Sequence, residues 1–167
     1  MEMNKKTALY PGTFDPITFG HLDIIKRASK IVDHIYVGVA NNKEKKCLFS
    51  LKDRIDIVKK TISSLPKQTK DKIKVVSFDM LTVNYCKKSN ASIIIRGLRV
   101  VADFEYEFQL SGMNSKLDKN IQTIFLTADI ENQAISSRMV KEIASLKGNV
   151  SQFAPKPALM YLKKKFK

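Results

Sequence analysis

The sequence predicts a doubly wound, Rossmann-like α/β fold, in which helices cover both faces of a parallel sheet. Short apolar runs alternate along the chain with segments whose apolar residues recur at helical spacing. The runs are apolar throughout, as expected of strands that are buried on both faces. The 167 residues, 44% of them hydrophobic, favour a single domain over residues 1–167.

The first half of the chain contributes five of the expected elements. In order, they are a strand at 8–10, a helix at 20–32, a strand at 34–40, a helix at 50–65 and a strand at 73–78. Ser50 and Asp53 are spaced as a helix-capping pair, and Pro66 follows the last apolar residue of that helix. The run at 34–40, HIYVGVA, is typical of a buried strand.

The second half continues the alternation. We expect a helix at 81–88, a strand at 92–95, a helix at 103–117, a strand at 121–127, a helix at 136–147 and a last helix opened by Pro155 or Pro157. The strand at 92–95 is β-branched and ends at Arg96-Gly97. Ser136 can cap the helix that follows it, and Gly148 is a suitable C-terminal stop.

Polar and turn-forming residues follow four of the expected strands. These segments are Thr13–His21, Asn41–Phe49, Arg96–Arg99 and Asn132–Arg138. Ligands of doubly wound sheets bind beyond the carboxyl ends of the strands, where the strand order reverses. We therefore expect the four loops to converge on one crevice.

The loop from Tyr10 to His21 is typical of a phosphate site. It joins an apolar strand to the start of an amphipathic helix, where free N–H groups and the helix dipole favour anions. Gly12 and Gly20 let the backbone approach a ligand closely, and His21 can touch that ligand.

Together the four loops offer cations and hydroxyls with few carboxylates, which suits phosphate oxygens. These residues are Thr13, Thr18, His21, Lys45, Arg96, Arg99, Ser136 and Ser137. The chain has no Walker motif, no Gly-x-Gly-x-x-Gly and no plausible serine, histidine and aspartate nucleophile set. Covalent catalysis is therefore not expected, whereas phosphoryl or nucleotidyl transfer needs mainly positioning and charge neutralisation.

The formal charge of +14 raises the alternative of a nucleic-acid-binding module. The lysines are scattered and do not gather beside stacking aromatics, so we expect a solvated surface and no nucleic-acid partner. The densest patches are Lys43-Glu44-Lys45-Lys46 and Lys163-Lys164-Lys165.

The cysteines and the hydropathy of the chain indicate the cellular compartment of the protein. Cys47 and Cys86 have no metal-ligand spacing and suggest no disulfide framework, which fits a reducing cytoplasm. No run approaches the roughly 20 apolar residues of a spanning helix, and the first residues do not resemble a signal peptide. We expect a cytoplasmic protein without a membrane partner.

Two motifs resemble those of a known superfamily. Thr18-x-Gly20-His21 resembles the T/H-x-G-H signature of the nucleotidylyltransferases, and Ile135-Ser136-Ser137-x-x-Val140-Lys141 resembles their second signature. Three further blocks resemble the phosphopantetheine adenylyltransferase family, in the right order and over nearly the whole chain. They are Tyr-Pro-Gly-Thr-Phe-Asp-Pro-Ile-Thr at 10–18, Ile-Arg-Gly-Leu-Arg at 95–99 and Ala-Asp-Phe-Glu-Tyr-Glu at 102–107.

The resemblance implies a reaction in which ATP and 4'-phosphopantetheine give dephospho-coenzyme A and pyrophosphate. It also implies a Mg²⁺-dependent homohexamer. Because Mg²⁺ usually keeps several waters and binds phosphate oxygens, we expect ATP and water to hold it, with no protein ligand. His21 would stabilise the transition state at the α-phosphorus. Lys45 and Arg96 would hold the phosphate of phosphopantetheine, and these three residues are the expected catalytic set.

Further contacts follow from the same resemblance. ATP would contact Thr13, Phe14, His21, Gly97, Leu98, Arg99, Glu107, Asn132, Gln133, Ala134, Ile135, Ser136, Ser137 and Arg138. Phosphopantetheine would contact Thr13, Lys45, Leu81, Thr82 and Arg96.

Some alternatives stay open at this point. The family commonly has an aromatic residue at the position of Asn132 and a hydroxyl residue at that of Arg138, so Arg138 either meets pyrophosphate or points into solvent. Lys45-Lys46-Cys47 replaces a common Lys-Lys-Pro, which leaves Lys45 and Lys46 as alternatives. Arg96 and Arg99 could instead pair with Asp103, Glu105 or Glu107. A related enzyme acting on another phosphate, such as nicotinate mononucleotide, remains a rival.

Overall fold

The computed structural model describes residues 5–42, 44–99 and 101–167, so Lys43 of the first lysine patch lies outside the described residues. Five strands form one parallel sheet in the order β3-β2-β1-β4-β5. The strands are β1 (Thr7–Gly12), β2 (His34–Ala40), β3 (Ile73–Phe78), β4 (Ile93–Leu98) and β5 (Gln122–Thr127). The order reverses between β1 and β4, which confirms the predicted doubly wound topology.

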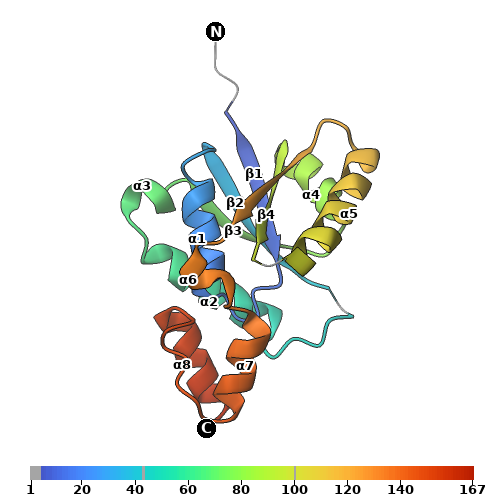
Figure 1. Cartoon of the computed structure of the whole chain (residues 1–167). Helices are drawn as coiled ribbons and strands as arrows, with labels where there is room; N and C mark the ends of the chain where they lie inside the picture. Colours follow the sequence, from blue (N-terminus) through green and yellow to red (C-terminus); the bar gives the residue numbers. More distant parts are fainter. Residues whose placement is uncertain (1–4, 43, 100) are drawn as a thin grey trace.

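Helices cover both faces of the sheet (Figure 1). They are α1 (Phe19–Ala28), α2 (Leu51–Ser63), α3 (Lys67–Lys70), α4 (Thr82–Ser89), α5 (Val101–Leu117), α6 (Ile130–Gln133), α7 (Ser137–Ser145) and α8 (Lys156–Lys165). α1 and α2 pack on one face, and α4 and α5 pack on the other. α7 and α8 lie together beyond the carboxyl edge of the sheet (Figure 1). Within the described residues, no helix combines the length and hydropathy that crossing a membrane requires.

The core has one layer on each face of the sheet because successive strand residues point to opposite sides. Tyr10 of β1 and Ile95 of β4 join the large cluster formed with α1, α2, α7 and α8. Leu9 and Ile94, their neighbours in the chain, pack instead with Val83 and other residues on the α4 side. This double burial explains the apolar runs of the inner strands, whereas the edge strand β3 exposes Lys74 and Ser77.

The strand predictions for β2 and β3 are confirmed residue for residue, but the one for β4 is too short. Arg96 and Gly97 pair with Phe125 and Leu126 of β5, so they form the end of a strand and are not part of a loop. The polar side chain of Arg96 hid this continuation, because a strand end that lines a site need not be apolar.

The ends of several helices differ from the predictions. α1 ends at Ala28 and not at Val32, because Ile31 and Val32 both donate backbone hydrogen bonds to the Ala28 carbonyl in a tight turn. The short helices α3 and α6 were not predicted, since four residues are too few to show an apolar period.

The predicted cap of α7 is confirmed, and its stop differs by one residue. Ser136 Oγ accepts a hydrogen bond of 3.1 Å from the Met139 N–H. Lys147, with φ of 62°, is the left-handed residue that ends the helix, and not Gly148. Gly148 is needed for space, since a Cβ there would lie 2.6 Å from Ile143 Cγ2.

Candidate active site

A cavity of about 540 Å³ lies at the carboxyl edge of the sheet, beside the point where the strand order reverses. Four segments predicted from the sequence contribute to its lining: the loop after β1 with the start of α1, the loop between β2 and α2, the end of β4, and the start of α7. Asp103 and Glu107 of α5 line it as well. The predicted convergence of these segments on one crevice is thereby confirmed.

Most of the predicted site residues line this cavity. They are Thr13, Phe14, His21, Lys45, Arg96, Gly97, Arg99, Glu107, Ile135, Ser136, Ser137 and Arg138. The others do not line it: Leu98, Asn132, Gln133, Ala134, Leu81 and Thr82. Leu98 is the last residue of β4, directly after the lining residue Gly97. Leu81 precedes α4 and is 59% exposed.

The T-x-G-H signature has a local physical explanation. Thr18 is the N-cap of α1, and His21 is the third residue of that helix. The Nδ1 atom of His21 accepts a hydrogen bond of 3.1 Å from the Thr18 backbone N–H and lies 2.9 Å from Thr18 Oγ1. Because Nδ1 accepts from a backbone N–H, the proton of the neutral imidazole is on Nε2.

The surroundings of His21 favour this neutral form. Burial, with the nearby Arg99 guanidinium as a second cause, lowers the pKa of His21 from 6.5 to about 4. The Phe14 ring packs edge-on against the imidazole, with ring centroids 5.2 Å apart. His21 therefore presents a neutral Nε2–H donor within the cavity lining.

The loop after β1 is tightly folded around Phe14. This residue adopts a left-handed backbone with φ of 49°, and its ring is buried. A Cβ at Gly12 would lie 2.8 Å from the Phe14 ring, so glycine is needed there for close packing. The Phe14 N–H has no hydrogen-bond partner in the described part of the chain, so it is free to bind an anion.

Arg96 reaches the cavity from the end of β4 and is held by Glu107 of α5. Its Nε donates to Glu107 Oε2 at 2.6 Å, and its Nη2 donates to Oε1 of the same carboxylate. Its Nη1 donates to the Pro11 carbonyl at 3.1 Å. The pairing considered from the sequence is therefore present, and it orients the guanidinium at the cavity wall.

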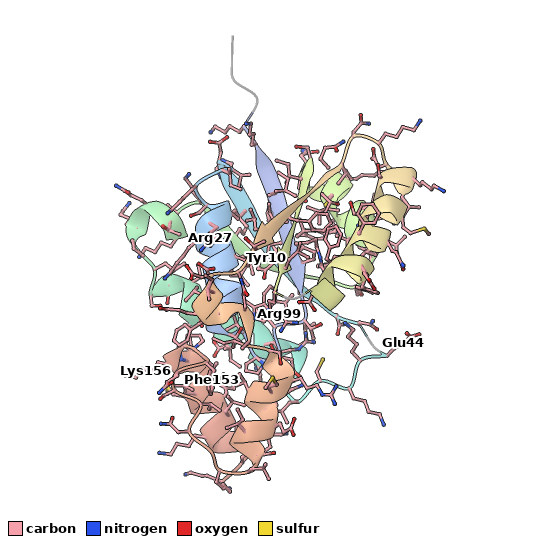
Figure 2. All side chains as sticks on the ribbon, viewed as in Figure 1. Tyr10, Arg27, Glu44, Arg99, Phe153 and Lys156 are labelled. Atoms are coloured by element: carbon pink, nitrogen blue, oxygen red, sulfur yellow. The ribbon has the colours of Figure 1, made fainter. Side chains whose placement is uncertain are left out.

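Arg99 forms the corresponding pair with Asp103, at 3.1 and 3.3 Å. Its Nη1 also donates to the Ile135 carbonyl at 3.2 Å, which ties the end of β4 to the segment before α7. Figure 2 shows Arg99 between the strand ends and the α6–α7 segment, whereas Arg27 lies away from it on α1.

Sequence reasoning missed the roles of Asp15 and Lys141. Asp15 is buried, and its carboxylate accepts hydrogen bonds from the N–H groups of Leu48 and Phe49 at 2.8 and 2.9 Å. Lys141 Nζ donates to the same carboxylate at 2.8 Å. This cluster joins three parts of the chain: the loop after β1, helix α7, and the loop before α2. Both residues lay within the recognised motifs, but their partners are too distant in sequence for a motif to reveal.

The cavity carries a surplus of positive charge. Its three carboxylates are those of Asp15, Asp103 and Glu107, and each pairs with one cation. Lys45, Lys46 and Arg138 also line the cavity and have no carboxylate partner among the described residues. The site can therefore attract polyphosphates.

Comparisons with known proteins agree with this geometry. A family model described as cytidylyltransferase-like matches residues 9–143. A phosphopantetheine adenylyltransferase from Pelagibacter ubique (strain HTCC1062) is 52% identical over 162 residues, covering 97% of this chain and 99% of that protein. Another, from Caulobacter vibrioides (strain NA1000 / CB15N), is 52% identical over 150 residues, covering 90% of this chain and 91% of that protein.

Solved structures show the same fold at lower identity. Plasmodium falciparum nicotinic acid mononucleotide adenylyltransferase, complexed with APC or with NaAD, has TM-scores of 0.72 and 0.75 and identities of 16% and 17%. Each match covers 96% of both chains. The fold, the two signatures in one cavity and the near full-length identity to the bacterial proteins all agree, and the chain belongs to the phosphopantetheine adenylyltransferase family of nucleotidylyltransferases.

Proposed function

We infer that this protein transfers the adenylyl group of ATP to the phosphate of 4'-phosphopantetheine, giving dephospho-coenzyme A and pyrophosphate. This reaction is the penultimate step of coenzyme A synthesis. The observation that carries the inference is the 52% identity, over 97% of the chain, to a protein of that name. The cavity supports it, because the residues of both signatures meet there beside a surplus of positive charge.

The proposed chemistry is one in-line displacement without a covalent enzyme intermediate. A phosphate oxygen of phosphopantetheine bonds to the α-phosphorus of ATP while the bond from that phosphorus to the bridging oxygen of the β-phosphate breaks. The second pKa of a phosphate monoester is about 6, so the attacking group is largely a dianion near neutral pH and needs no strong base. The protein's main task is to hold two anions in line.

His21 would stabilise the transition state as a hydrogen-bond donor. Its Nε2 carries the proton and Thr18 fixes the ring from the opposite side. Negative charge that builds up on the α-phosphate oxygens strengthens this hydrogen bond in the transition state. The developing charge also favours protonation of the ring, against the burial that lowers the pKa in the ligand-free protein.

Cations of the cavity lining would hold the phosphate of the second substrate. We assign the phosphate of phosphopantetheine to Arg96 and Lys45, with Lys46 as the alternative lysine. Glu107 was expected to contact the nucleotide, but both its carboxylate oxygens accept from Arg96. We therefore assign Glu107 the orientation of Arg96.

The triphosphate would lie against the start of α7. Ser136 Oγ accepts from the Met139 N–H, so the N–H groups of Ser137 and Arg138 remain for the β- and γ-phosphates. Arg138 lines the cavity beside them and suits the leaving pyrophosphate better than a solvent-facing role. The nucleotide would also contact backbone of Gly97 to Arg99, and the segment from Asn132 to Ala134 would cover it.

Mg²⁺ would enter with ATP. The three cavity carboxylates are occupied by Lys141, Arg99 and Arg96, an arrangement that suits a metal bound chiefly by phosphate oxygens and water. When bound, the ion neutralises phosphate charge and so adds to the effect of the cavity cations.

Leu81 and Thr82 remain our candidates for the pantetheine arm. They follow β3, whose end lies beside the start of the lysine-bearing loop, since the Asn41 N–H donates to the Phe78 carbonyl at 2.8 Å. An arm extending from a phosphate held by Lys45 and Arg96 could reach them along this edge of the sheet.

We propose a homohexamer, for which α5 offers the supporting observation. Large apolar side chains are exposed along this helix: Phe104, Tyr106, Phe108, Met113 and Leu117. Such a cluster on one helix is typical of a surface that another subunit covers. We further propose a cytoplasmic location, since Cys47 and Cys86 are free thiols.

The reaction is tested by product identification. The protein is incubated with ATP, Mg²⁺ and either 4'-phosphopantetheine or nicotinate mononucleotide, and the products are identified by mass spectrometry. We expect dephospho-coenzyme A from the first acceptor and no dinucleotide from the second. A dinucleotide with no dephospho-coenzyme A would show that the acceptor is assigned incorrectly. Affinity for oligonucleotides, measured against salt concentration, tests the nucleic-acid alternative.

A further inference from the structure

We propose that Arg54 is a positioning residue for both phosphate-binding loops, and that its buried charge strengthens the binding of anions in the cavity. Arg54 belongs to α2 and does not line the cavity. The proposal rests on the proposed function, since it concerns how this site holds ATP and pyrophosphate.

The Arg54 guanidinium bridges the ends of two neighbouring strands. Its Nη1 donates to the Thr13 carbonyl at 2.7 Å and to the Ala40 carbonyl at 3.0 Å. The last paired residues of β1 and β2 are Gly12 and Val39. Thr13 and Ala40 directly follow them, so both carbonyls lie where the loops leave the sheet. One side chain thus fixes the direction in which both loops leave the sheet: the loop that leads to His21 and the loop that carries Lys45.

The contact to Thr13 also orients a candidate anion donor. The Thr13–Phe14 peptide is trans, so its C=O and N–H point in opposite directions. With the carbonyl held by Arg54, the Phe14 N–H points away from α2. This N–H has no partner among the described residues, and Phe14 lines the cavity. Arg54 thereby helps to hold the strained, left-handed backbone of Phe14 in its binding orientation.

The charge of Arg54 has no evident structural use. The residue is 3% exposed, forms no ion pair within the described ranges, and leaves Nε without a hydrogen-bond partner there. By contrast, Arg96, Arg99 and Lys141 are each matched by a carboxylate. A buried unpaired charge is destabilising, and a neutral donor could serve a carbonyl at lower cost. The missing counter-charge is therefore an anion bound in the cavity in front of the two loops.

The test compares two variants that differ in charge. Arg54→Lys keeps a cation and Arg54→Gln keeps only a neutral donor. Affinity for inorganic pyrophosphate and for Mg²⁺-ATP is measured by calorimetry, the melting temperature is measured without ligand, and kcat and KM are measured for ATP.

We expect both variants to fold, with similar melting temperatures. Arg54→Gln should bind pyrophosphate roughly tenfold more weakly than Arg54→Lys, the scale of one charge interaction screened by protein and water. Its KM for ATP should rise by a similar factor, and Arg54→Lys should stay close to the unaltered protein. Equal affinities of the two variants would overturn the proposal, as would failure of either to fold, because Arg54 would then serve only the fold. An unaltered protein that binds neither anion would overturn the proposed function as well.

Discussion

The Nδ1 atom of His21 accepts a hydrogen bond of 3.1 Å from the backbone N–H of Thr18, the residue that caps the same helix. This relationship assigns the ring proton to Nε2 and fixes the orientation of the imidazole. The spacing of T-x-G-H is thus the spacing between a helix cap and the third helical residue, which brings the imidazole back onto the cap of its own helix.

The buried imidazole should make stability depend on pH. The pKa of His21 is lowered by burial from 6.5 to about 4, so between these values the unfolded chain binds a proton that the folded chain does not. The free energy of unfolding should therefore fall as the pH is lowered through this window, by roughly 3 kcal/mol in total. Urea unfolding across the window measures this. His21→Ala should abolish this pH dependence. His34 is exposed, so His34→Ala should keep it. The same pH dependence in the unaltered protein and in both variants would refute the buried neutral form of His21.

Loss of Arg96 should weaken phosphopantetheine binding. Hydrogen bonds to charged groups typically contribute about 1.5–3 kcal/mol, so Arg96→Ala should raise KM for phosphopantetheine roughly 10- to 100-fold. Steady-state kinetics with each substrate varied in turn measure the change. An effect confined to ATP would place Arg96 on the other substrate.

Two controls sharpen that experiment. Arg27 is also held by ion pairs, with Asp23 and Asp129, but it does not line the cavity. The kinetics of Arg27→Ala should therefore be unchanged. The double variant Arg96→Ala/Glu107→Ala removes the carboxylate that the single variant leaves unpaired. If the double variant recovers normal KM, repulsion by Glu107 caused the loss and Arg96 does not hold the phosphate.

The two serine caps offer a matched pair. Ser136 and Ser50 each accept a hydrogen bond of 3.1 Å from the N–H three residues later. Replacing either by alanine should lower the free energy of unfolding by about 1 kcal/mol. Only Ser136→Ala should raise KM for ATP, by about two- to tenfold, since only Ser136 lines the cavity. Equal KM values for the two variants would remove Ser136 from the triphosphate site.

The apolar surface of α5 should control assembly. Phe108 on α5 is 63% exposed, and Met160 on α8 is 65% exposed. Because the two side chains are equally exposed, replacing each by aspartate shows whether a position on α5 matters for assembly. Phe108→Asp should shift the protein to smaller species in light scattering after size-exclusion chromatography, and Met160→Asp should not. A monomeric unaltered protein at micromolar concentration would contradict the proposed hexamer.

The strands and the location of the cavity could be predicted from local sequence. The residues from Ile35 to Val39 are buried or half-buried, as are Val75, Val76 and Phe78, and such apolar runs show their pattern locally. Parallel strands then bring their carboxyl ends to one edge, which places the loops together.

The pairings that hold the site could not be predicted in this way. Asp15 and Lys141 are 126 residues apart, and Arg54 reaches back 41 residues to Thr13. Contacts of this kind depend on the relative placement of whole helices, which no local pattern encodes. Arg96 was assigned to a loop for a related reason, because a charged side chain at a strand end interrupts the apolar pattern while the backbone pairing continues.

The central claim is that the cavity transfers an adenylyl group with the help of His21. The most direct test measures pyrophosphate release from ATP and Mg²⁺, with and without 4'-phosphopantetheine, for the unaltered protein and for His21→Ala. We predict release only when phosphopantetheine is present, and a turnover about 10²–10³-fold lower in the variant at a nearly unchanged melting temperature. Equal turnover in the two proteins, or no release from the folded unaltered protein, would contradict the claim.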